Sequence, residues 1–133
     1  MAVTIYVHLT WTTRERAELI DQAGADFLRD FIPKAARRRG GTVLATGIVS
    51  NHVHLVVLLP SVIDIPKLVQ GIKGASARIA NRDGVIKGRK LRWASGYDLR
   101  SISPRLLRVA TANVHGQDRK HPALAIGRSS VSP

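Results

Sequence analysis

One apolar run that carries two histidines constrains the fold of this chain most strongly. Residues 52–60 read His-Val-His-Leu-Val-Val-Leu-Leu-Pro, and such a run of aliphatic and β-branched residues is typical of a buried strand. Pro60 closes the run because proline has no N–H to donate to a sheet. Side chains alternate across a strand, so His52 and His54 share one face, with Cβ atoms about 7 Å apart. The strand therefore presents two imidazoles together, and a cation or a phosphate can bind between them.

The composition indicates a single domain with a polyanionic partner. The chain has 133 residues, and 21 Lys and Arg against 9 Asp and Glu give a net charge of +12. Fold stability does not require that excess, which favours nucleic acid first and an anionic membrane surface second. The absence of cysteine excludes disulfides and thiolate zinc sites. No leader-like region and no apolar run near 18 residues are present, so we expect a cytoplasmic protein without membrane segments.

The periodicity along the chain predicts an α+β fold. Its expected elements, in order, are a strand at 3–11, a helix at 21–39, strands at 43–49 and 52–60, a helix at 64–82, a strand at 98–102 and a helix at 103–120. The order βαββαβ fits a ferredoxin-like or RRM-like antiparallel sheet with two helices on one face, plus a C-terminal helix. We expect one domain over residues 1–121 and a flexible tail over 122–133.

Several single residues refine the helix predictions. Asp21 and Asp64 are expected N-caps of the first two helices. Pro33 lies within the first helix and predicts a kink or a break there. Gly71 and Gly74 lie within the second helix, and their missing side chains would let a ligand or another backbone approach closely.

Basic residues concentrate in two short stretches, at 37–39 and at 87–92. Their density, with an aromatic residue alongside, favours contact with a single-stranded or hairpin nucleic acid. If about five phosphates are neutralised, log K should fall with log salt at a slope near about −3.5 for single strands. The candidate nucleic-acid-binding residues are Arg14, Arg37, Arg38, Arg39, Lys73, Lys87, Arg89, Lys90, Arg92 and Trp93.

Five motifs in order resemble a known family over nearly the whole chain. They are Tyr6-Val-His-Leu-Thr-Trp-Thr-Thr-Arg14, Asn51-His-Val-His-Leu-Val56, Ile72-Lys-Gly-Ala-Ser76, Leu91-Arg-Trp93 with Gly96-Tyr97, and Gln117 followed by His121-Pro122. With them the chain resembles the HUH single-tyrosine transposases of the insertion-sequence-200/605 kind and their REP-associated relatives. This resemblance implies a homodimer that acts on single-stranded DNA with hairpin ends.

The resemblance also implies a metal-dependent strand cleavage. Two histidines and a glutamine would hold Mg²⁺ or Mn²⁺, and a tyrosine four residues before the glutamine would attack the scissile phosphate. Carried over by position, the metal ligands are His52, His54 and Gln117, and the place of the nucleophile is taken by Asn113. An amide cannot form the covalent phosphotyrosine link. Metal binding should weaken below about pH 6, because protonated imidazoles cannot act as ligands.

Three interpretations of Asn113 remain open from the sequence. The chain can be a decayed or domesticated transposase that binds DNA without cutting it, which we favour. The register on the last helix can differ, although no tyrosine follows Tyr97. Alternatively, Tyr97 replaces the nucleophile. A module that binds RNA hairpins is a further hypothesis, because a 2′-hydroxyl can also be recognised.

Overall fold

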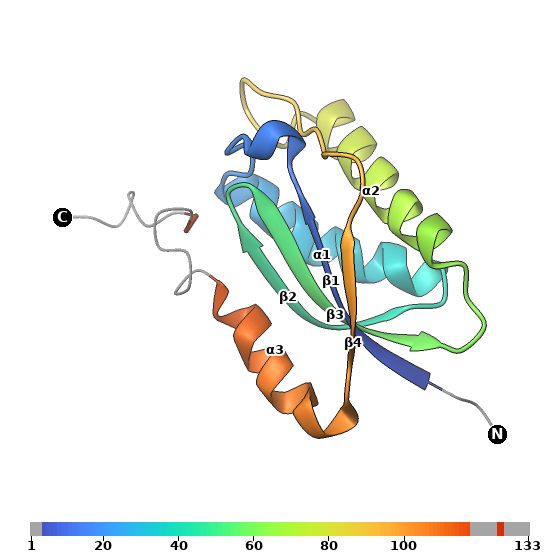
Figure 1. The fold of residues 1–133 in the computed structure, drawn as a ribbon. Helices are drawn as coiled ribbons and strands as arrows, with labels where there is room; N and C mark the ends of the chain where they lie inside the picture. Colours follow the sequence, from blue (N-terminus) through green and yellow to red (C-terminus); the bar gives the residue numbers. More distant parts are fainter. Residues whose placement is uncertain (1–3, 118–124, 127–133) are drawn as a thin grey trace.

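A four-stranded antiparallel sheet forms the centre of the protein (Figure 1). The computed structural model describes residues 4–117 and 125–126. The strands pair in the spatial order β2-β3-β1-β4. Their bounds are Thr4–Thr12 for β1, Thr42–Val49 for β2, His52–Pro60 for β3 and Asp98–Ile102 for β4. The predicted α+β class and the order βαββαβ are confirmed.

Two helices cover one face of the sheet, as predicted, and the third lies against the other face (Figure 1). Helix α1 spans Gln22–Arg38 and helix α2 spans Ile65–Arg82. They enclose the main core with the inward residues of the central strands, Val7, Leu9, Trp11, Val53, Leu55, Val57 and Leu59. Helix α3, Leu107–His115, contacts β2 and β3, where Val114 packs on Val56 and Ala45. Within the described residues, no helix is long and apolar enough to cross a membrane.

The predicted N-caps of the first two helices are confirmed, and the helix does not break at Pro33. The Asp21 carboxylate accepts from the Gly24 N–H at 2.7 Å, and Asp64 accepts from the Lys67 N–H at 3.1 Å. Helix α1 continues through Pro33. A proline removes one backbone hydrogen bond, and the fully buried neighbours Ile32 and Ala36 keep the helix packed on the sheet.

The last helix starts later than predicted. Ser103 caps a 3₁₀ turn at Pro104–Leu106 by accepting from the Arg105 N–H, and α3 begins only at Leu107. Its α-helical bounds end at His115. Residues 118–120, the end of the predicted helix, lie outside the described residues, as does most of the predicted tail at 122–133.

Glycine allows two close approaches in this fold. A Cβ on Gly47 of β2 would collide with the Val114 carbonyl oxygen of α3, so α3 can reach the sheet only because residue 47 has no side chain. At Gly71 the Arg39 guanidinium occupies the space of the missing Cβ. At Gly74 no atom lies within 4 Å of that position. Within the described residues, a side chain rather than another backbone approaches Gly71, and Gly74 borders open space.

Candidate functional site

The two histidines of β3 project from the same face of the sheet. Their ring centroids lie 4.8 Å apart with the planes at 75°. Strand β1 runs beside them and pairs Thr12 with His52 and Thr10 with His54. The shared face predicted from the alternation is confirmed, and it is the face on which α3 lies, because Val56 continues the same alternation and packs on Val114.

His52 is held by its neighbour Asn51. The His52 Nδ1 atom lies 2.7 Å from the Asn51 Oδ1 atom, and both residues are buried. Because an amide oxygen only accepts, Nδ1 carries the proton and the ring lone pair is at Nε2. The Asn51 amide nitrogen donates to the Arg16 carbonyl at 3.3 Å. A fixed Nδ1–H with the lone pair at Nε2 is the usual state of a metal-ligating imidazole.

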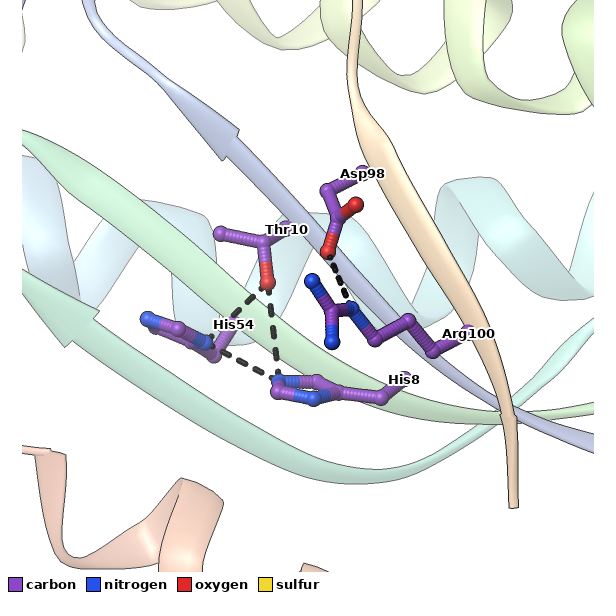
Figure 2. Close-up of polar contacts among 5 residues, drawn as sticks. All are labelled: His8, Thr10, His54, Asp98 and Arg100. Atoms are coloured by element: carbon purple, nitrogen blue, oxygen red, sulfur yellow. Dashed lines mark hydrogen bonds and ion pairs between the residues drawn. The ribbon is translucent and has the colours of Figure 1, made fainter.

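His54 is held by two residues of β1 (Figure 2). Its Nδ1 atom lies 3.0 Å from His8 Nε2 and 3.1 Å from Thr10 Oγ1. The His8 and His54 rings are also stacked, with centroids 5.2 Å apart. Since Nδ1 of His54 is engaged by β1, a metal ion would be bound through Nε2.

Gln117 is brought against β2, the strand next to His54, by the close docking of α3. Gly47 is the strand partner of His54, and a Cβ on Gly47 would lie 3.0 Å from Gln117 Cγ. Adjacent strands are about 4.8 Å apart, so Gln117 lies over the strand next to His54. Its amide nitrogen donates to the Asn113 carbonyl at 3.1 Å. Its Oε1 atom is buried with no hydrogen-bond partner in the described structure, so this oxygen is available as an acceptor or a metal ligand.

The donor set of this site fits a divalent cation. Two imidazole nitrogens and one amide oxygen suit Mn²⁺, and Mg²⁺ would need further oxygen ligands from water or phosphate. Across residues 4–117 and 125–126, no group of three or more His, Cys, Asp or Glu side chains could hold a metal ion. The Gln117 oxygen is therefore the candidate for a third protein donor to a cation at His52 and His54.

Asn113, which the resemblance puts at the position of the family nucleophile, has no nucleophilic group. Asn113 is exposed on α3, one turn before Gln117, and its carbonyl accepts the Gln117 hydrogen bond. Tyr97 lines a hollow with α2, which covers the opposite side of the sheet from the histidines. That placement argues against Tyr97 as a substitute.

Four of the predicted basic residues come together in one hollow. Its volume is about 390 Å³, and Arg14, Arg89, Lys90 and Arg92 line it with Glu15. The two chain segments are joined by a hydrogen bond from the Arg14 N–H to the Arg92 carbonyl.

The backbone beside this basic hollow is strained. Glu15 and Arg16 have φ angles of 57° and 56°, in the left-handed region that residues with a side chain rarely adopt. The Arg16 carbonyl also accepts the hydrogen bond from the Asn51 amide nitrogen. The strained segment thus connects the basic hollow to His52.

The remaining predicted basic residues lie elsewhere. Arg37 and Arg38 are exposed at the end of α1, and Lys87 is exposed outside the basic hollow. Arg39 packs against Gly71 and donates to the Ala35 carbonyl at 3.1 Å.

Lys73 and Trp93 have structural contacts of their own. The Lys73 ammonium donates to the Ala94 and Gly96 carbonyls at 2.7 Å each, and partial burial lowers the pKa of this ammonium. The Trp93 indole N–H donates to Ser76 at 3.0 Å, and its ring meets Trp11 edge to face. These contacts fix both residues against the fold.

Sequence reasoning underrated the side chains of β1 and β4 around His54. His8 was not among the predicted site residues, but it contacts His54 directly. Arg100 of β4 is the strand partner of His8, and Figure 2 shows its guanidinium extending over the sheet beside Asp98, to which it donates at 3.1 Å. The register between strands brings these residues together, whereas the alternation of residues 3–11 indicates only which side chains share a face.

Comparison with known proteins identifies the family. The profile of the family described as "Transposase IS200 like" matches residues 2–117. The chain belongs to this family. Within it, the ISDra2 transposase TnpA of Deinococcus radiodurans is 34% identical over 71 residues, which are 53% of this chain and 51% of the relative. The chain thus aligns with about half the length of that relative.

Two solved structures share the fold of this IS200-like chain. A transposase from Deinococcus radiodurans R1 superposes with a TM-score of 0.68 at 22% identity, covering 95% of both chains. The REP-associated tyrosine transposase bound to a REP hairpin gives 0.68 at 18% identity, covering 91% of this chain and 71% of that one.

Proposed function

We propose that this IS200-like transposase binds single-stranded or hairpin DNA at the histidine face and the neighbouring basic hollow, with Mn²⁺ or Mg²⁺ at His52, His54 and Gln117. The observation that carries the proposal is the pair of imidazoles on one face of β3, together with the unpartnered buried oxygen of Gln117, a residue whose Cγ lies against Gly47, the strand partner of His54. A bound divalent cation would polarise a phosphodiester and offset charge on its oxygens. The fold shared with a REP-hairpin-bound transposase supports a hairpin ligand.

The basic hollow would hold the DNA backbone near the metal ligands. Arg14, Arg89, Lys90 and Arg92 supply cations with no sequence preference, which position a strand rather than read it. The tip of the β2–β3 hairpin lies against this segment, because the Thr13 N–H donates to the Asn51 carbonyl at 2.9 Å. A phosphate bound at the basic hollow would therefore lie close to His52.

We further propose that the protein binds DNA without forming a covalent link to it. Asn113 offers an amide where the family mechanism needs a phenol, and an amide cannot become a phosphodiester leaving group. The backbone role of residue 113, accepting from Gln117, does not depend on its side chain. The metal site would thus persist after the loss of the nucleophile.

A binding assay with a denaturing gel tests both proposals. We expect a hairpin oligonucleotide with single-stranded flanks to bind with a steep salt dependence, to bind more tightly with Mn²⁺, and to give no covalent adduct. An RNA hairpin of the same sequence serves as competitor. Preference for RNA, or affinity indifferent to salt, would contradict the proposed ligand. Light scattering of the complex tests the homodimer that we also propose from the family resemblance.

A further inference from the structure

A second hollow lies between α2 and the segment that leads into β4. Its volume is about 390 Å³, and Val69, Lys73, Gly74, Ala77, Trp93 and Tyr97 are among its lining residues. It is separate from the basic hollow, with which it shares no lining residue. Its walls combine apolar side chains, two aromatic rings and the helix backbone at Gly74.

This second hollow is preformed on two sides, because Trp93 and the loop at 94–96 are both fixed. Trp93 is held by its hydrogen bond to Ser76 and by the edge of Trp11. The loop at 94–96 is held by Lys73, which donates to two of its carbonyls. Binding of a ligand would thus cost little entropy for ordering these parts of the hollow.

The shape of the second hollow suits a flat ring. Gly74 has no atom within 4 Å of the place where a Cβ would stand, so the helix side is open to close approach. Tyr97 is 38% exposed and offers a ring for stacking. Gln70, also at the hollow, has an amide that can both donate to and accept from the edge of a base.

The geometry points to the second hollow as a binding site for one unpaired nucleobase of the DNA strand, a statement that rests on the function proposed above. Tyr97 precedes Asp98, the strand partner of Thr10, and Thr10 contacts His54. A strand held by its phosphate near the histidines would therefore reach the hollow around the β4 edge. The net charge of +12 favours a strand of DNA over a neutral aromatic ligand.

Filling the second hollow tests this inference directly. Gly74→Leu places a side chain into open space, and leucine is a better helix former than glycine, so we expect the variant to fold. Ser61→Leu adds the same side chain at an exposed position outside the hollow and is the matched control. The probes are a series of DNA hairpins with a single-stranded tail, and each probe carries 2-aminopurine at a different tail position.

We expect wild-type protein and Ser61→Leu to quench 2-aminopurine at one tail position, and Gly74→Leu to abolish that quenching. Gly74→Leu should weaken the affinity for the tailed hairpin roughly tenfold, in line with the loss of one stacked base. Its affinity for the hairpin without a tail should be unchanged. Tyr97→Ala should act similarly, and Tyr97→Phe should retain the quenching because the ring remains.

The two proposals fail in distinguishable ways. If wild-type protein binds the hairpin DNA but Gly74→Leu binds and quenches equally well, the nucleobase site is wrong and the DNA-binding function stands. If wild-type protein binds neither hairpin nor tail, the proposed function is wrong and the nucleobase site falls with it.

Discussion

Asn51 Oδ1 accepts a hydrogen bond from His52 Nδ1 at 2.7 Å, while the amide nitrogen of the same Asn51 donates to the Arg16 carbonyl. One buried side chain thus joins a candidate metal ligand to the strained segment beside the basic hollow. Asn51 is a positioning residue in this arrangement, because it acts through the His52 ring.

Replacing Asn51 should weaken metal binding without removing a ligand. We expect Asn51→Ala to lower the Mn²⁺ affinity roughly ten- to a hundredfold, as is usual for the loss of a hydrogen bond to a ligating histidine. Asn51→Asp keeps the acceptor for His52 Nδ1 and should retain more of the affinity. Calorimetric titration with Mn²⁺ measures the effect, and thermal unfolding shows whether the buried site remains folded. Equal affinities for wild type and Asn51→Ala would contradict the positioning role.

Restoring a phenol at position 113 should restore covalent chemistry. Residue 113 is exposed and its side chain makes no hydrogen bond that the structure describes, so Asn113→Tyr should fold normally. With Mn²⁺ and a hairpin substrate, we expect a protein–DNA adduct on a denaturing gel. Asn113→Phe is the control, since it adds the ring without the hydroxyl. If Asn113→Tyr binds Mn²⁺ and DNA but forms no adduct, the assignment of position 113 is wrong.

Neutralising one cation of the basic hollow should change the salt dependence. If Arg92 contacts one phosphate, Arg92→Gln should reduce the slope of log K against log salt by about 0.7. Lys34→Gln removes the same charge from the outer side of α1, where Lys34 pairs with Asp30 at 3.0 Å. We expect the slope of this control to match wild type. Fluorescence anisotropy at several salt concentrations measures both slopes. Equal changes in both variants would mean that overall charge, rather than the basic hollow, sets the affinity.

A side chain at position 47 should displace α3. Gly47→Ala would place a methyl group against the Val114 carbonyl and Gln117, so we expect a loss of about 1–3 kcal/mol in the free energy of unfolding. It should also weaken Mn²⁺ binding by shifting Gln117. Gly74→Ala, where no atom is within 4 Å, should be neutral or stabilising. Urea unfolding and metal titration check both variants, and an unperturbed Gly47→Ala would exclude this docking of α3.

The local patterns in the sequence predicted the scaffold, and tertiary contacts decided the site. Alternation in 52–60 placed His52 and His54 on one face, because a strand fixes the side of every second residue. The contact of His8 with His54 depends on the strand register, which alternation alone does not define.

The helix and loop predictions divide in the same way. The caps at Asp21 and Asp64 were predictable because each involves residues three apart. The meeting of Arg14 with Arg92 across the chain had no local signal, since it results from the backbone bridge between their segments. Lys73 was predicted as a DNA contact from its charge, and its two carbonyl partners became visible only in the fold.

The dependence of α3 on Gly47 also has a kinetic consequence. The β2–β3 hairpin is joined by a turn of two residues and can form early. Contact between Gly47 and Val114 instead joins residues far apart in the sequence, so it requires the closure of a long loop. We therefore expect Gln117 to reach the histidines in one of the last steps of refolding. Mn²⁺, present from the start, would then bind only as the final helix arrives.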